Sequence, residues 1–153
     1  MANSILEILN NRILIAGCLA WACSQVIKTL IHLILNHRLV WERLVGDGGM
    51  PSSHSATVTA VAVMTGLLRG WNSAEFAIAA ILAIVVMHDA MGVRQETGKQ
   101  AKAINSMMEM FETLGAKNLT PEETLKEFVG HTPLQVLAGL LLGLTVALIF
   151  VHI

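Results

Sequence analysis

The chain has 153 residues, of which 54% are hydrophobic and only 14% are charged, and its mean hydropathy is +0.64. An average soluble domain carries about a quarter charged residues, so this composition favours a small integral membrane protein. The net charge of −1 gives no electrostatic case for nucleic-acid binding. Both cysteines, Cys18 and Cys23, lie in one apolar stretch, which excludes a disulfide framework. The length predicts a single domain over residues 1–153.

Four apolar stretches approach the roughly 20 residues that a membrane-crossing helix needs. They run from about Ile13 to Leu35, Ser55 to Leu68, Ala74 to Val93 and Pro133 to Ile153, and the second is short for a span. A soluble four-helix core is disfavoured because the last stretch contains no charged residue at all. We therefore predict an all-α fold, an integral membrane bundle of about four transmembrane helices.

The longest polar region lies between the third and fourth spans. From about Gln95 to Leu114, apolar residues recur three and four positions apart, at Ala101, Ile104, Met108 and Phe111. This spacing predicts an amphipathic helix. A short second helix is expected from about Thr120, which has N-cap character, to Gly130. Both helices are expected at the membrane surface or over the bundle.

Four consecutive crossings must alternate in direction. The end of the first span, the start of the second, the end of the third and the start of the fourth therefore share one side of the membrane. The unusual polar residues all fall at these four places: Lys28, His54, His88, Asp89, Arg94 and His131. The topology alone thus predicts that residues far apart in the sequence converge.

Lys28 lies about two turns before the end of the first span and shares a helix face with Gln25 and His32. A lysine at membrane depth costs about 2.5–3.5 kcal/mol on insertion scales, so a functional role facing the bundle interior is its default interpretation. The alternative is a lysine that extends its ammonium to the nearby interface.

Two further features favour an anion site. A glycine-flexible loop, Gly48–Ser55, leads into a helix start that contains His54, and His131 precedes a second helix start at Thr132. Helix N-termini present N–H groups and partial positive charge, which suits phosphate, although serines there could merely cap the helix. One imidazole could attack phosphorus while the other protonates the leaving oxygen.

Metal binding is the competing use of these polar side chains. The spacing of the candidate ligands matches no compact ligand motif, so no metal or cofactor is expected. The candidate ligands would be His54, His88, Asp89 and His131.

Three segments, GGMPSSHSATV, DAMGVRQETGKQAKAIN and LKEFVGHTPLQVLAGLLLG, resemble the divergent branch of the type-2 phosphatidic acid phosphatase superfamily. That superfamily is related to acid phosphatases and vanadium-dependent haloperoxidases. The resemblance covers almost the whole chain. It implies that Lys28 binds phosphate, that Pro51–His54 form the second motif with His54 as general acid, and that His131 is the nucleophile that forms a phosphohistidine.

The chain also departs from the superfamily pattern. Leu35 and Leu125 stand where the motifs carry arginines, so Arg38 or Arg43 and, by topology, Arg94 would have to replace them. Ser53 replaces a glycine. Gln135 replaces the acidic residue that orients the nucleophile, so Asp89 or Glu127 would have to supply the charge. The predicted catalytic residues are His131, His54 and Asp89, and the predicted substrate-binding residues are Lys28, Arg94, Ser52, Ser53, Arg43 and Gln135.

The function expected from these residues is a membrane-embedded lipid phosphatase that hydrolyses a phosphomonoester or pyrophosphate of an amphiphilic substrate. Phosphatidate, phosphatidylglycerophosphate and polyprenyl pyrophosphate are all compatible. The alternative is a non-catalytic membrane protein that binds phosphorylated lipid or acts as an assembly partner, and a haloperoxidase is a distant third. The expected partners are a phosphorylated lipid and membrane lipids, and a homo-oligomer stays an open alternative.

The loop charges predict the orientation of a multi-pass cell-membrane protein. Seven basic residues lie on the motif side against Arg12 and Arg69 on the other: Arg38, Arg43, Arg94, Lys99, Lys102, Lys117 and Lys126. The site is therefore expected at the cytoplasmic face.

Overall fold

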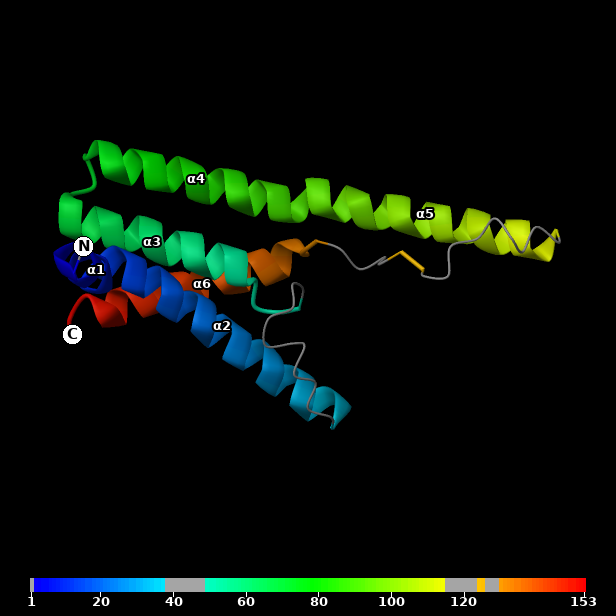
Figure 1. Ribbon diagram of the computed structural model, residues 1–153, viewed down its shortest axis with the longest axis horizontal. Coiled ribbons are helices and arrows are strands. Elements are labelled where there is room, and N and C mark those ends of the chain that lie inside the picture. The colour runs from blue at the N-terminus through cyan, green and yellow to red at the C-terminus, as the bar shows by residue number, and fades with distance from the viewer. Residues whose placement is uncertain (1, 38–48, 115–123, 126–129) are drawn as a thin grey trace.

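The computed structural model describes residues 2–37, 49–114, 124–125 and 130–153, and every regular element in them is helical. Figure 1 shows how the helices are arranged. The all-α prediction is confirmed. In chain order the elements are α1 (Ala2–Leu9), α2 (Arg12–Asn36), α3 (Ser53–Arg69), α4 (Ala74–Met91), α5 (Val93–Thr113) and α6 (Pro133–Phe150).

Helix α3 is the centre of the bundle and packs against α2, α4 and α6. Its buried side chains are small or short: a compact cluster of Ala20 from α2 with Ala56 and Ala60 from α3 lies at the core. Leu142 and Val146 of α6 pack against that cluster. Short side chains at these positions let the helices approach closely, and the larger apolar residues face outward, where lipid would cover them.

Three helical stretches within the described residues are long and apolar enough to cross a membrane: Arg12–Asn36, Ala74–Phe111 and Pro133–Phe150. The predicted second span is also helical, but α3 has only 17 residues, nine of them buried. It is therefore the shortest and most enclosed of the four bundle helices. The four predicted apolar helices all form, although three rather than four have the length of a span.

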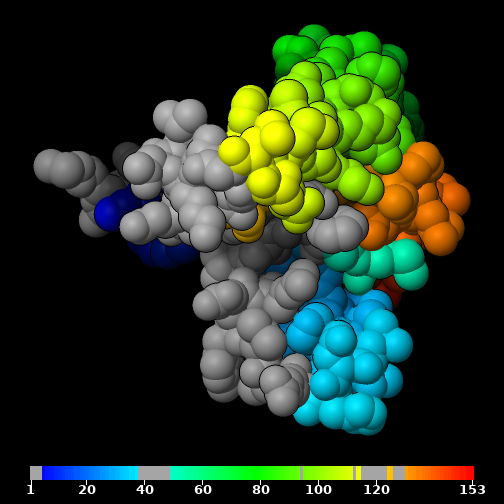
Figure 2. Space-filling view, turned by 90° about the vertical axis from the view of Figure 1, so that its right-hand side faces the viewer, coloured from blue at the N-terminus to red at the C-terminus, as the bar shows by residue number. Residues whose placement is uncertain are grey.

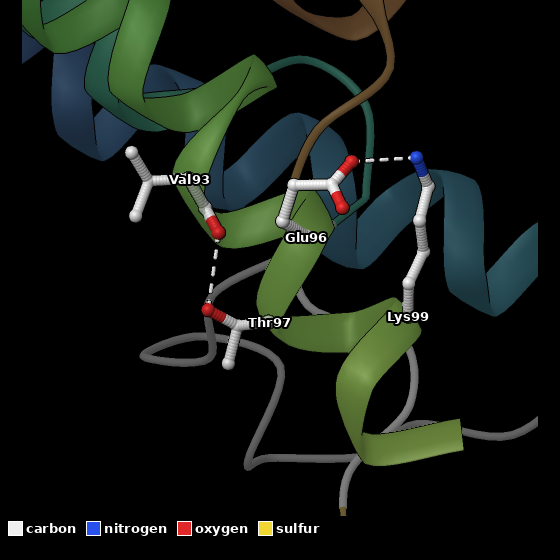
Figure 3. A network of polar contacts seen from close by, with 4 residues as sticks. All are labelled: Val93, Glu96, Thr97 and Lys99. Atoms are coloured by element: carbon white, nitrogen blue, oxygen red, sulfur yellow. Dashed lines mark hydrogen bonds and ion pairs between the residues drawn. The ribbon is translucent and has the colours of Figure 1, made fainter. Parts of the chain in front are cut away.

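Helix α5 continues the direction of α4 and projects beyond the starts of α3 and α6 (Figure 1). Its bounds match the predicted amphipathic helix closely. On its polar side Lys99 Nζ contacts Glu96 Oε1 at 2.6 Å, and Thr97 Oγ1 donates to the Val93 carbonyl at 3.0 Å (Figure 3). On its apolar side Ala101 is buried and Met107 is exposed. Most of the short helix predicted near Thr120–Gly130 lies outside the described residues, and the residues described within that range, 124–125 and 130, are not helical.

The opposite end of the bundle holds both chain termini (Figure 1). The short helix α1 there was not among the sequence predictions. Asn11 caps the start of α2, where its side chain accepts from the N–H groups of Ile13 and Leu14. Arg12 donates to the carbonyls of Phe150 and Val151 at 3.0 and 3.1 Å. This contact ties the start of α2 to the end of α6.

Two glycines of α6 set its distance from α3. A Cβ built on Gly139 would lie 2.9 Å from Ser55 Cβ and would collide with the Ser52 carbonyl. A Cβ built on Gly143 would lie 3.0 Å from Thr59 Cβ and would collide with the Ala56 carbonyl. The small-xxx-small spacing of these glycines therefore serves helix packing within one chain.

We predict that Gly139→Val destabilises the protein, because the added side chain has to push α6 away from the α3 backbone. Overpacking of this kind typically costs about 1–3 kcal/mol. The measurement is the unfolding midpoint of the purified protein in a denaturant titration. Leu141→Val, on the exposed side of the same helix, is the control and should shift the midpoint little. Equal stability of Gly139→Val and wild type would contradict this account of the packing.

Candidate functional site

The first component of the site is the buried ammonium of Lys28, whose side chain is 6% exposed. Its Nζ donates a hydrogen bond to Ser53 Oγ at 3.1 Å. Gly49, with a φ of +85°, lies over the aliphatic part of the lysine, because a Cβ built there would be 4.0 Å from the Lys28 Cγ and Cδ. The lysine therefore points into the bundle at the start of α3, as the functional interpretation predicts, and does not extend outward.

The second component is the N-terminus of α3. Ser52 is its N-cap and is fully buried. Ser52 Oγ accepts from the N–H of Ser55 at 3.3 Å and from Ser55 Oγ at 3.1 Å. The backbone N–H of Ser52 donates to the Gln135 carbonyl of α6 at 3.0 Å. Ser52 thus stabilises the helix start and its junction with α6, while Ser53 contacts the lysine.

The third component is His131, which immediately precedes the N-cap of α6 and is 3% exposed. Its backbone N–H donates to the Ala90 carbonyl near the end of α4 at 2.9 Å. Its Nδ1 lies 3.3 Å from Gln135 Oε1. The same oxygen accepts from the N–H of Thr132 at 3.0 Å, which forms one half of a capping box. Gln135 therefore fixes both the helix start and the orientation of the imidazole.

The two histidines meet at this point. The ring centroids of His54 and His131 are 6.0 Å apart, with an interplanar angle of 57°. Figure 2 looks onto this end of the molecule, where the starts of α3 and α6 lie side by side. Of the six residues that the topology was predicted to bring together, Lys28, His54 and His131 lie at the adjoining starts of α3 and α6, where Lys28 contacts Ser53 and His131 contacts Gln135.

The geometry suits an anion. A buried ammonium and the N-termini of two helices point their positive ends toward one region. Two imidazoles in the same region can exchange protons or attack an electrophile. The arrangement can bind a phosphoryl group and supply both a nucleophile and an acid to it.

For the remaining predicted site residues, the structure describes fewer contacts or none. Asp89 is half-buried and directly precedes Ala90, so its backbone lies beside that of His131. Arg43 and the side chain of Arg94 lie outside the described residues. His88, one of the alternative metal ligands, is exposed. Within the described part of the chain, no three His, Cys, Asp or Glu side chains are grouped so that they could hold a metal ion.

One buried residue of α2, one turn before Lys28, was not assigned a role from the sequence. Gln25 is 4% exposed, and its Oε1 is buried with no hydrogen-bond partner in the described part of the chain. The sequence carried a signal for it, because its spacing places it on the helix face of Lys28. The spacing could not show that its amide would be buried.

Comparison with known proteins identifies the family of the chain. The family model described as "Divergent PAP2 family" matches residues 9–146. The uncharacterized membrane protein YuiD of Bacillus subtilis (strain 168) is 37% identical over 155 residues, which cover 96% of this chain and 98% of that protein. No solved structure matches the chain. The match spans every residue that converges in the bundle, and the chain is thus a membrane protein that belongs to the divergent PAP2 family.

Proposed function

We propose that the protein is a membrane-embedded lipid phosphatase that hydrolyses a phosphomonoester or pyrophosphate of an amphiphilic substrate. The observation that carries this proposal is the 6.0 Å separation of the His54 and His131 rings, next to a buried lysine that is bonded to the same helix start. Membership of the divergent PAP2 family supports it. The substrate tail would stay in lipid while the phosphoryl group reaches the convergent helix ends.

The proposed reaction has two steps. Because Nδ1 of His131 faces Gln135, Nε2 attacks phosphorus, so that an N–P bond forms while the P–O bond to the leaving group breaks. His54 gives its proton to the leaving oxygen. Water then attacks the phosphohistidine, the N–P bond breaks, and His54 takes the proton from the water. The products are inorganic phosphate and a lipid with one phosphate fewer, which is an alcohol from a phosphomonoester and a monophosphate from a pyrophosphate.

Charge stabilisation falls to the residues that hold the phosphoryl oxygens. The Lys28 ammonium carries three N–H donors in all, and one of them reaches Ser53. The helix starts of α3 and α6 add partial positive charge. Fixed donors that are shielded from water stabilise developing negative charge more strongly than solvent does.

A second candidate function is binding of a phosphorylated lipid without turnover. The observation that favours it is the neutral side chain of Gln135 beside His131. An amide can orient an imidazole, but it cannot stabilise an imidazolium by charge. Tight phosphate or vanadate binding with no hydrolysis of any lipid would support this candidate.

The primary prediction concerns phosphate release by the purified protein from a panel of phosphatidate, phosphatidylglycerophosphate and polyprenyl pyrophosphate. Wild type should release phosphate from at least one of them. His131→Ala should reduce release to background, and His54→Ala should reduce it by about 10²–10⁴-fold, the usual contribution of a general acid.

The matched control for these variants is His88→Ala. This histidine lies near the same end of the bundle but is exposed, so its removal should leave the rate unchanged. Equal release by wild type, His131→Ala and His54→Ala would contradict the catalytic assignment.

Gln135 is proposed as a positioning residue. We expect Gln135→Leu to lower kcat by about tenfold or more with little change in KM, because His131 loses its oriented contact. Gln135→Glu keeps an acceptor at that position and should restore kcat. Thr132→Val removes the N-cap at a cost of about 1 kcal/mol in stability, and it should leave kcat unchanged. A loss of kcat in Thr132→Val equal to that in Gln135→Leu would assign the effect to helix capping.

We also propose that the site faces the cytoplasm, on the basis of the excess of basic residues at that end. The test places single cysteines in a Cys18→Ala, Cys23→Ala background, at Ser106 on α5 and at Asn72 between α3 and α4. Both positions are exposed. A membrane-impermeant maleimide should label Asn72→Cys in intact cells and Ser106→Cys only after permeabilisation. The reverse pattern would overturn the orientation.

A further inference from the structure

The buried amide of Gln25 is the starting observation. A side-chain carbonyl that lacks a hydrogen bond inside a protein is unfavourable, because it has lost its contact with water. Gln25 is 4% exposed, and its Oε1 has no partner in the described part of the chain. An acceptor in this position is suited to a donor that arrives with a ligand.

The register of α2 against α3 places this amide at the phosphoryl site. Ala20 of α2 packs with Ala56 and Ala60 of α3, and Lys28 reaches Ser53. Gln25 lies between Ala20 and Lys28 on the buried face of α2. It therefore faces the first turns of α3. Residues three apart on a helix have Cβ atoms about 5–6 Å apart, so the amide and the ammonium border the same space.

We propose that Gln25 is a specificity-determining residue of this site, whose Oε1 accepts the hydrogen of a protonated phosphoryl oxygen. The inference rests on the phosphoryl-binding part of the proposed function. A phosphoryl group with one proton has an O–H to donate, whereas a sulfate ion near neutral pH has none. The site therefore prefers a protonated phosphoryl group to a sulfate of the same shape.

Charge alone would give the opposite order. A sulfate ion carries two negative charges, whereas the doubly protonated phosphate that predominates at about pH 6 carries one, so the Lys28 ammonium attracts sulfate more strongly. A measured preference for phosphate therefore has to come from an acceptor in the site. Within the described residues, Gln25 Oε1 is a buried acceptor on the same helix face as Lys28.

The chain offers a matched control in Thr59. Its Oγ1 is also buried and also lacks a hydrogen-bond partner in the described part of the chain. Thr59 packs against Gly143 of α6. It follows Ser53 by six residues, which places it about 9 Å further along α3. Thr59→Val removes a second unpaired oxygen at nearly constant shape, but away from the lysine.

The test is calorimetric titration of the purified full-length protein in detergent with inorganic phosphate and with sulfate, at about pH 6, where phosphate retains at least one proton. Wild type should bind phosphate about tenfold more tightly than sulfate, or better, as one hydrogen bond to a charged group allows. Gln25→Met should bring the ratio close to one by weakening phosphate alone. Thr59→Val should keep the wild-type ratio.

Other outcomes have definite meanings. The inference would be overturned if Gln25→Met kept the wild-type ratio of phosphate to sulfate affinity, or if it lost affinity for both anions equally. Absence of phosphate binding to the wild type would also overturn it. Gln25→Asn withdraws the amide by one methylene and should also lower the ratio of phosphate to sulfate affinity. It replaces Gln25→Met in the test if that variant does not fold. Lipid phosphate release is measured on the same samples. A normal ratio without any turnover would overturn the phosphatase proposal and leave the role of Gln25 standing.

Discussion

The buried ammonium of Lys28 is the constraint on which the arrangement of this bundle depends. A lysine at membrane depth costs about 2.5–3.5 kcal/mol and has to meet polar groups inside the protein. Ser53 meets it at 3.1 Å, which fixes the start of α3 at the level of the lysine, well before the end of α2. The loop at Gly49 covers the lysine stem. The contact with Lys28 therefore positions the start of α3.

Close packing of α3 and α6 brings the remaining groups to that charge. Gly139 and Gly143 let the α6 backbone touch the α3 backbone, and the Ser52 N–H then reaches the Gln135 carbonyl. With the two helix starts joined, His54 and His131 come within 6.0 Å of each other. The same few contacts thus hold the fold together and bring together the groups that the proposed chemistry needs.

Much of this arrangement follows from the sequence, because alternating crossings fix which helix ends meet. The convergence of Lys28, His54 and His131 needs only the order and direction of the apolar stretches. Other features depend on detail that periodicity does not contain. The bond from the His131 N–H to the Ala90 carbonyl and the burial of the Gln25 amide depend on how closely the backbones approach. The near-collinear arrangement of α5 and α4 (Figure 1) is another such feature, because the glycine at their junction, Gly92, is equally compatible with a sharp turn.

The central claim is that Lys28, His54 and His131 share one tetrahedral anion. The most direct measurement is an experimental structure of the protein with orthovanadate bound in lipid nanodiscs. The account predicts vanadium at bonding distance from Nε2 of His131, with vanadate oxygens in hydrogen-bond contact with Lys28 Nζ and the His54 ring. Vanadate bound elsewhere, or bound to only one of these three side chains, would contradict it.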